Sequence, residues 1–270
     1  MVSFGLLAAA CGGDGDTSND ASSPKDTPEA AATSEVIEPA DITPRVSADE
    51  VAAAGELEGT DPAWTVQPSI NQLHVVGAEP GATLELLDTG GTATAGVVDA
   101  QGAFLWRDIP AGTYQVRTVG EPTEISDAVA VTDPTDAPDQ TFYVDQRIEE
   151  GFGYITVRDG TTLSTTVWLP GPADRGPFPT VVEYSGYSPS NPDDATFAQL
   201  YNSLGYAYVG VNMRGTGCSG GSFEFFEPAQ LTDGYDVIEA VAAQPWVAHG
   251  HVGMVGVSYP GISQLFVAST

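Results

Sequence analysis

The feature that most constrains this chain is a glycine-flanked serine that joins an apolar strand to a helix-like segment near its last residue. The apolar run at residues 251–257 leads into the stretch Gly256-Val257-Ser258-Tyr259-Pro260-Gly261. A serine hydroxyl is a weak nucleophile unless a sharp strand-to-helix turn lifts it clear of the sheet, and such a turn needs glycine where backbone segments come close. The sequence therefore predicts Ser258 as a catalytic nucleophile. The alternative is a serine that caps an ordinary helix.

Proline stands two positions after this serine, where such turns usually have glycine, and Gly261 follows one residue later. Pro260 would fall in the first turn of the helix, where its missing N–H has no partner to lose and its fixed φ suits the helix. The substitution is therefore compatible with the turn.

Charge and size limit the classes of function. The chain has 270 residues, a formal net charge of -29 and 41% hydrophobic residues, which is enough to form one or two globular cores. Nucleic acids and anionic membrane surfaces repel so acidic a protein, so we expect neither as a partner. The two cysteines, Cys11 and Cys218, lie too far apart for a metal-binding pattern, and we expect no metal or cofactor. The oligomeric state is not predicted.

The first residues resemble the export signal of a bacterial lipoprotein. Residues 1–11 end in an apolar run with small residues before Cys11, which is the lipidation position in such signals. Residues 12–59 are rich in Asp, Ser, Thr, Pro, Ala and Glu and predict a disordered acidic tether. We therefore expect an extracellular, cell-surface protein whose only contact with the membrane is a lipid at Cys11.

Residues 60–145 predict a small antiparallel β-sandwich. Short runs of alternating polar and apolar residues are separated by Gly- and Pro-containing turns. The runs cover residues 72–77, 82–87, 103–106, 113–118 and 127–132. Residues 80–87 and 102–116 resemble the carboxypeptidase-regulatory-like and transthyretin-like modules, which implies a spacer or adhesion module.

Residues 146–270 predict an α/β domain with a mostly parallel sheet. A hairpin at residues 153–158 and 163–169 precedes strands that alternate with helices. The later strands are expected at residues 179–184, 207–212 and 251–257, and the helices at residues 193–204 and 228–244.

Three motifs in this region carry a specific resemblance. Gly-Val-Ser258-Tyr-x-Gly is preceded by residues 233–246 (DGYDVIEAVAAQPW) and 213–223 (MRGTGCSGGSF). Together they resemble the X-Pro dipeptidyl-peptidase and cocaine-esterase-like (CocE/NonD) hydrolases, which implies an α/β-hydrolase fold. The resemblance also implies an Asp and a His after the serine, but the twelve residues that follow Ser258 contain neither. We therefore expect this chain to be C-terminally truncated and inactive alone.

The same resemblance assigns two oxyanion donors, the backbone N–H of Tyr259 and the hydroxyl of Tyr187. Gly186 stands where the family has proline, so Tyr187 could instead be a core tyrosine, and Tyr184 is a second candidate. A donor directed at the position where negative charge develops lowers the barrier of acyl transfer.

Other residues are weaker candidates. His74, His249 and His251 all precede the serine, which argues against a role as its base. Arg214 and Asp233 are expected to form a buried ion pair that fixes loops near the site. The GxGxxG pattern at residues 215–220 follows a late strand and does not open a first βαβ unit, so we do not interpret it as a dinucleotide site.

These features predict a serine hydrolase that cleaves an ester or amide through an acyl-enzyme on Ser258. The resemblance implies X-Pro peptides or acyl esters as substrates. The alternative is a surface-attached binding protein that uses the β-sandwich and carries a non-catalytic hydrolase remnant.

Overall fold

A computed structural model describes residues 59–91 and 93–270 of the chain. The predicted signal segment, the lipidation site at Cys11 and nearly all of the predicted tether at 12–59 lie outside the described residues. Within the described residues, every helix is too short or too polar to cross a membrane.

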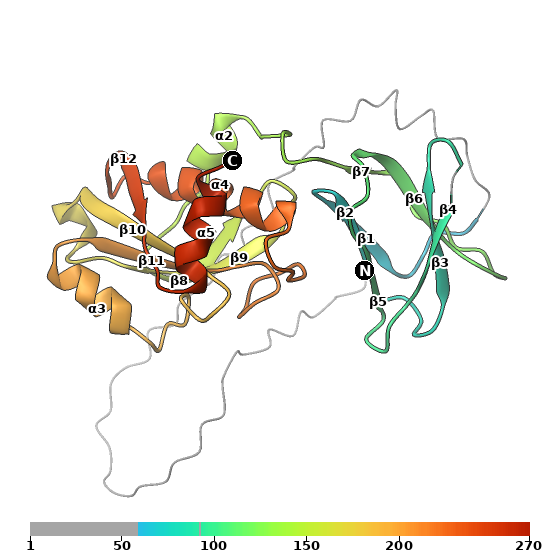
Figure 1. Cartoon of the computed structure of the whole chain (residues 1–270), viewed down its shortest axis with the longest axis horizontal. Helices are drawn as coiled ribbons and strands as arrows, with labels where there is room; N and C mark the ends of the chain where they lie inside the picture. Colours follow the sequence, from blue (N-terminus) through green and yellow to red (C-terminus); the bar gives the residue numbers. More distant parts are fainter. Residues whose placement is uncertain (1–58, 92) are drawn as a thin grey trace, which may run out of the picture. The chain divides into compact units, whose positions relative to one another are not determined.

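The first region consists of two antiparallel sheets that enclose one apolar core (Figure 1). One sheet has the order β1 (Thr65–Ser69), β2 (Gln72–Val76), β5 (Ala103–Trp106), and the other has the order β4 (Ala93–Val97), β3 (Thr83–Asp88), β6 (Gly112–Thr118), β7 (Val129–Val131). Leu73 and Val75 meet Leu84 and Val116 in the core, as the alternating pattern predicts. The two sheets form a β-sandwich around this core.

The sequence prediction missed two strands of this region, β1 and β4. β1 contains Pro68 and lies at the edge of its sheet, where a residue without an N–H is tolerated. β4 is also an edge strand, and its small side chains are mostly exposed. Neither strand therefore shows the strong apolar alternation from which strands are predicted.

The second region contains a mixed five-stranded sheet with the order β12-β10-β11-β9-β8. The hairpin of β8 (Gly151–Thr156) and β9 (Thr162–Trp168) is antiparallel, and β9 also pairs antiparallel with β11 (Ala207–Asn212). β10 (Phe178–Ser185) pairs in parallel with both β11 and β12 (Val247–Met254). A short 3-10 helix, η1 (Ala173–Arg175), precedes β10. The three parallel strands therefore end on the same side of the sheet.

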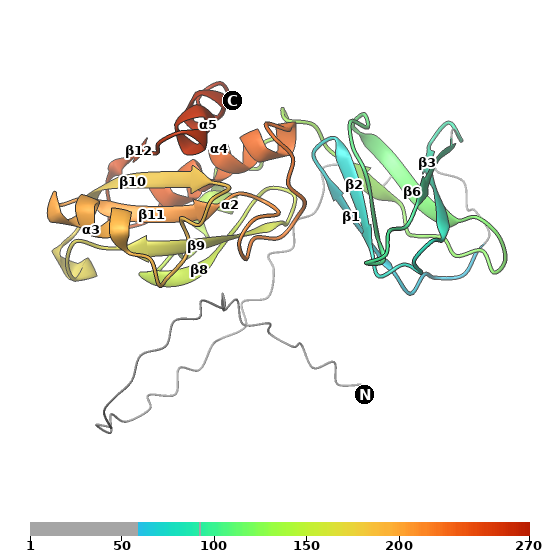
Figure 2. The same ribbon diagram turned by 60° about the horizontal axis from the view of Figure 1, so that its bottom comes forward.

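Helices connect the parallel strands and cover the sheet (Figure 2). α3 (Thr196–Ser203) contacts β11, and Ala198 packs with Val181 and Tyr208. α4 (Pro228–Ala242) and α5 (Tyr259–Val267) contact β12 and β10, and they share a core with Val182 and Val209. Since neighbouring residues of one strand point to opposite faces, Val181 and Val182 reach different helices. α2 (Gln140–Val144) packs on α4.

One predicted strand, residues 251–257, is wrong at both ends. β12 begins at Val247, and its pairing with β10 shifts register between Phe178 and Thr180. His249 and Gly250 have φ values of 61° and 63° there, which is the backbone of an irregular strand. The strand ends at Met254 because the chain then turns toward α5. The helix expected at residues 193–204 is likewise shorter, as α3.

Candidate active site

Ser258 lies at the bend between β12 and α5, with φ 67° and ψ -122°. This positive φ is uncommon for any residue other than glycine, and such strain is kept where surrounding structure enforces it. Ser258 is exposed, whereas Tyr259 and Pro260 directly after it are buried. The bend therefore presents the serine hydroxyl to solvent while the start of the helix is anchored in the protein.

Gly256 is required at this bend by close approach. A Cβ at this position would lie 2.4 Å from the Cβ of Pro260, and the φ of Gly256 is 154°. Pro260 lies in the first turn of α5, where the sequence placed it. The proline ring thus fills the space that a side chain at position 256 would need, and the two residues specify the bend together.

Tyr187 is the tyrosine that reaches Ser258. Its hydroxyl lies 3.5 Å from Ser258 Oγ, and its side chain is 56% exposed. Its backbone is held on both sides: the N–H donates to Ser185 Oγ at 3.0 Å, and the carbonyl accepts from Asn212 Nδ2 at 3.0 Å. Ser185 and Asn212 are the last residues of β10 and β11, so the ends of two parallel strands position this side chain.

Tyr184, the other tyrosine considered, is turned into the core. Its side chain is 1% exposed, and its hydroxyl donates to the carbonyl of Gln230 at 2.9 Å. Burial raises the pKa of this hydroxyl well above its usual value. Tyr184 therefore joins β10 to α4 and does not contact Ser258.

Tyr259 opens α5, and the first N–H groups of a helix have no partner inside it. The backbone N–H of Tyr259 is therefore available at the positive end of the helix dipole, next to the Ser258 hydroxyl. Its side chain is buried, and the phenol donates to Gln230 Oε1 at 2.7 Å. Burial raises the pKa of this phenol.

A cluster of aromatic rings surrounds the Tyr259 side chain. The ring centroids of Phe226, Phe225 and Phe223 lie 5.3, 5.6 and 6.4 Å from that of Tyr259. The ring centroid of Tyr187 also lies 6.4 Å from that of Tyr259. The cluster was not predicted from the sequence, although the run Phe223-Glu224-Phe225-Phe226 was a visible signal of an apolar wall.

The predicted ion pair of Arg214 and Asp233 is confirmed. The Arg214 guanidinium donates to both oxygens of Asp233, at 2.5 and 2.7 Å, and the two side chains are 2% and 0% exposed. The same guanidinium reaches Asp159 at 3.0 Å and Ser69 Oγ at 3.1 Å, which the sequence did not reveal. Burial opposes the charge of Arg214, but the two carboxylates outweigh it and raise its pKa.

A second buried charge network lies on the neighbouring turn of α4. Asp236 accepts hydrogen bonds from the Tyr143 hydroxyl at 2.7 Å and from the Arg158 guanidinium at 2.7 Å. Burial raises the pKa of Tyr143, and the nearby Asp236 raises it further. This network ties α2 and the end of β8 to α4. Asp233 and Asp236 thus fix α4 from one face.

No histidine in residues 59–91 and 93–270 hydrogen-bonds Ser258. His74 lies in β2, where burial lowers its pKa, and His249 and His251 lie exposed in β12. The hydroxyl of Ser258 has Tyr187 as its side-chain neighbour within hydrogen-bonding reach.

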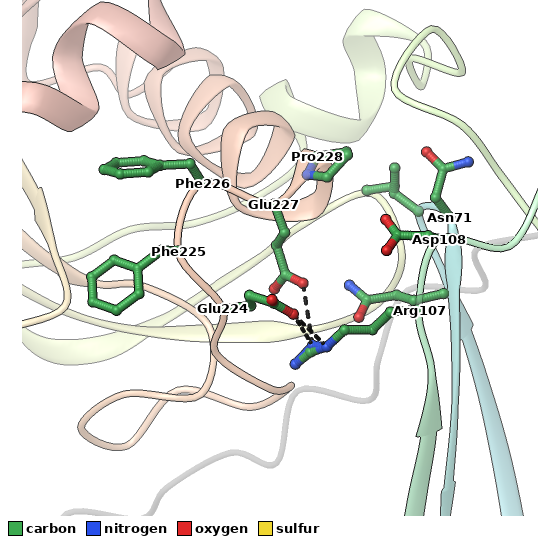
Figure 3. Close-up of a pocket in the computed structure, with 10 residues that line it drawn as sticks. Asn71, Arg107, Asp108, Glu224, Phe225, Phe226, Glu227 and Pro228 are labelled. Carbon is green, nitrogen blue, oxygen red and sulfur yellow. Dashed lines mark hydrogen bonds and ion pairs between the residues drawn. The ribbon is translucent and has the colours of Figure 1, made fainter. Parts of the chain in front are cut away.

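A pocket of about 250 Å³ lies where a turn of the first region meets the segment before α4 (Figure 3). Glu224 and Glu227 point toward Arg107, while Phe225 and Phe226 point away from it. The remaining lining residues are Ile70, Asn71, Gln72, Asp108 and Pro228.

Comparison with known families gives a match for the part of the chain that contains this bend. Residues 159–270, a little under half of the chain, match the family model described as X-Pro dipeptidyl-peptidase (S15 family). The resemblance seen in the sequence is confirmed. The matched segment begins at Asp159, includes Arg214 and Asp233, and contains the Ser258 bend.

Two curated relatives are candidate serine esterases of Mycobacterium bovis and Mycobacterium tuberculosis. Each is 27% identical to this chain over 130 residues, an alignment that covers 41% of this chain. The alignment spans 20% of the length of each relative, so this chain covers about a fifth of the proteins it matches.

Similar solved structures include a CocE/NonD family hydrolase from Staphylococcus aureus, at 24% identity and a TM-score of 0.39, covering 47% of this chain and 29% of that one. Another is Est1E from Butyrivibrio proteoclasticus with bound ferulic acid, at 23% identity and a TM-score of 0.37, covering 43% and 47% of the two chains. The family match and the geometry of the bend, not these low scores, support the function proposed below.

Proposed function

We propose that this protein is a serine hydrolase of the S15 and CocE type, with an α/β-hydrolase fold, in which Ser258 forms an acyl-enzyme with an ester or amide substrate. The observation that carries the proposal is the strained, exposed Ser258 at a strand-to-helix bend, with the Tyr187 hydroxyl 3.5 Å from its Oγ. A serine that served only as a helix cap would need no such backbone. Ser258 also makes no side-chain cap hydrogen bond to α5.

The chemistry follows from the positions of three groups. Ser258 Oγ attacks the substrate carbonyl carbon, its proton passes to a base, and the carbonyl oxygen becomes an oxyanion. The Tyr259 N–H and the Tyr187 hydroxyl then donate hydrogen bonds to that oxyanion. Collapse of the intermediate expels the alcohol or amine, which takes up the proton, and water later releases the acid. None of the described histidines is placed to be the base.

The finer assignment is to acyl esters or X-Pro peptides. The family match names a dipeptidyl-peptidase, and the curated relatives are named as esterases, so both substrate classes are tested together. A simple activated ester and an X-Pro arylamide present the same carbonyl to Ser258 but differ in leaving group.

The decisive experiment is covalent labelling of the full-length protein with a fluorophosphonate. We expect labelling of the wild type and of Ser269→Ala, an exposed serine at the end of α5, and no labelling of Ser258→Ala. Ester turnover should fall at least about 10³-fold in Ser258→Ala. Labelling that persists in Ser258→Ala, or a wild type that does not label, would overturn the proposal.

Tyr187 is tested by removing only its hydroxyl. Tyr187→Phe should lower kcat by about 10²-fold with little change in KM, because an oxyanion donor acts in the transition state. Tyr154→Phe, a half-exposed tyrosine in β8, is the control and should leave kcat unchanged. Equal rates for the Tyr187 variant and the wild type would remove Tyr187 from the mechanism.

We also propose that the protein is attached to the bacterial cell surface by lipidation of Cys11. The support is the apolar run that precedes this cysteine in the sequence. Metabolic labelling with a fatty-acid analogue should mark the wild type and not Cys11→Ser. Equal labelling of the two would show that the lipid is elsewhere.

A further inference from the structure

The segment Ser222–Glu227, called here the phenylalanine segment, has its phenylalanine rings on one side and its carboxylates on the other. It connects the loop after β11 to α4, and Phe223, Phe225 and Phe226 all pack on the ring of Tyr259. Its carboxylates, Glu224 and Glu227, point to the opposite side (Figure 3). Tyr259 directly follows Ser258, so the three rings pack on the residue next to the candidate nucleophile.

One arginine of the β-sandwich holds this segment along its whole length. Arg107, directly after β5, donates to Glu224 at 2.9 Å, to Ser222 Oγ at 2.9 Å and to the Phe223 carbonyl at 3.4 Å. It also lies 3.6 Å from the Glu227 carboxylate. A guanidinium presents five N–H donors in a fixed plane, so it can join several acceptors that a flexible ammonium would not hold together.

The segment needs such support because its backbone is strained. Phe226 has a φ of 58°, which is unfavourable for a bulky residue and persists only where neighbouring groups enforce it. Its N–H donates to Gln230 Oε1 at 3.2 Å, which fixes the α4 side. The Arg107 contacts fix the other side.

The charges of this contact are only partly screened by solvent. The side chain of Glu227 is 9% exposed and that of Arg107 is 25% exposed, whereas Glu224 is 55% exposed. Burial raises the pKa of Glu227 and Arg107 opposes that rise, so the guanidinium favours the charged carboxylate. Removal of Arg107 would leave the buried Glu227 carboxylate without its ion-pair partner, and Arg214 would be the cation that still acts on its charge.

We propose that Arg107 is a positioning residue through which the β-sandwich shapes the acyl-binding wall next to Ser258, and that this wall accepts apolar acyl groups. The acyl part rests on the proposed function; the positioning part does not. The sandwich is then a structural part of the substrate site and not a separate adhesion module. Arg107 touches no substrate and acts only through the phenylalanine segment.

Hydrogen exchange tests the positioning part without any need for catalysis. In Arg107→Ala, amides of residues 222–227 should exchange roughly tenfold faster, while those of β10 and β11 keep their protection. Arg107→Lys should restore part of the protection. Arg117→Ala is the matched control, because it removes an arginine whose pair with Glu85 lies wholly inside the sandwich. Unchanged exchange of residues 222–227 in Arg107→Ala would overturn the proposal.

Kinetics with esters of increasing acyl length test the substrate part. Arg107→Ala and Phe225→Ala should both raise KM for long acyl esters by roughly tenfold, and they should lower kcat/KM for the acetyl ester by a smaller factor. Equal losses for short and long esters would contradict a role in acyl recognition. If the full-length wild-type protein turns over no ester, the proposed function and the acyl part both fail, and the exchange experiment still decides the positioning part.

Discussion

The β-sandwich and the α/β region of the described chain have different kinds of core. The β-sandwich buries apolar side chains such as Leu73, Val75 and Leu84, and its buried polar residues are uncharged. The α/β region has a comparable apolar core, but it also buries Arg214, Asp233 and Asp236 with exposed fractions of 2% or less. These three charges lie on α4 and on the loop after β11 that packs on it. Glu183 of β10 is a further buried carboxylate, and it accepts a hydrogen bond from the Tyr208 hydroxyl.

The apolar core and the buried ion pairs contribute to the fold in different ways. An apolar core stabilises a fold without fixing individual groups by direction, whereas a buried ion pair adds little net stability and requires a defined geometry. The sandwich has little need of such pairs among its described residues. The α/β region uses them to fix α4, against which α5 packs.

Removal of the Arg214 guanidinium tests this comparison most directly and should have the largest effect. Arg214→Ala should destabilise the α/β region by about 3–5 kcal/mol, because Asp233 would remain buried without its partner. Chemical denaturation would measure the lost free energy of unfolding, and hydrogen exchange would show whether the loss lies in the α/β region. Arg117→Ala in the sandwich removes a half-exposed pair and should cost no more than about 1 kcal/mol. Equal losses in the two variants would contradict the comparison.

An apolar truncation should have the complementary effect on the sandwich. Leu84 is fully buried there, and Leu84→Ala should cost about 3 kcal/mol through lost burial and the cavity that remains. The loss should appear in residues 60–132 and leave the protection of β10 and β11 unchanged. If β10 and β11 lose protection equally, the two regions unfold as one cooperative unit.

A smaller effect is expected where α4 meets α5. Gly234 lies inside α4, and a Cβ there would lie 2.3 Å from Val267 Cγ2 and 3.1 Å from the Tyr184 ring. Gly234→Ala should therefore cost about 2 kcal/mol, although alanine is normally favoured in a helix. Gly153→Ala is the control, since its Cβ would meet nothing within 4 Å. A stabilised Gly234→Ala variant in thermal unfolding would show that the two helices can move apart.

The smallest effect concerns Asp159, the outer carboxylate of the Arg214 network. Burial favours its neutral form, but Arg214 and the hydrogen bonds of Ser69 and Thr161 outweigh burial and lower its pKa. Its charged form therefore stabilises the fold above its ordinary pKa of 3.8, and the contribution is lost as pH falls through the lower folded value. Asp159→Asn should cost about 1 kcal/mol near neutral pH and less below about pH 4. Denaturation of the wild type and of Asp159→Asn at several pH values measures the difference in their free energies of unfolding. A difference that increases in acid would contradict the prediction.

Patterns close together in the sequence predicted much of this structure. Alternation found five strands of the sandwich, and apolar runs found β10 and β11 almost to the residue. The bend at Ser258 was predictable because Gly256 and Pro260 lie within five residues of each other. The predicted catalytic roles of Ser258, Tyr187 and Tyr259 stay predictions.

Contacts between distant residues could not be predicted in this way. Ser69 and Asp159 are ninety residues apart and meet only because two regions fold against Arg214. The contact of Arg107 with Glu224 spans 117 residues. Neither pair has a local sequence pattern from which its contact could be predicted.

The side chain of Gln230 gives the site a shared acceptor. Its Oε1 atom receives the Tyr259 phenol and the Phe226 N–H, at 2.7 and 3.2 Å, from inside α4. One amide oxygen of α4 therefore links the backbone of the phenylalanine segment to the side chain of the residue that follows Ser258.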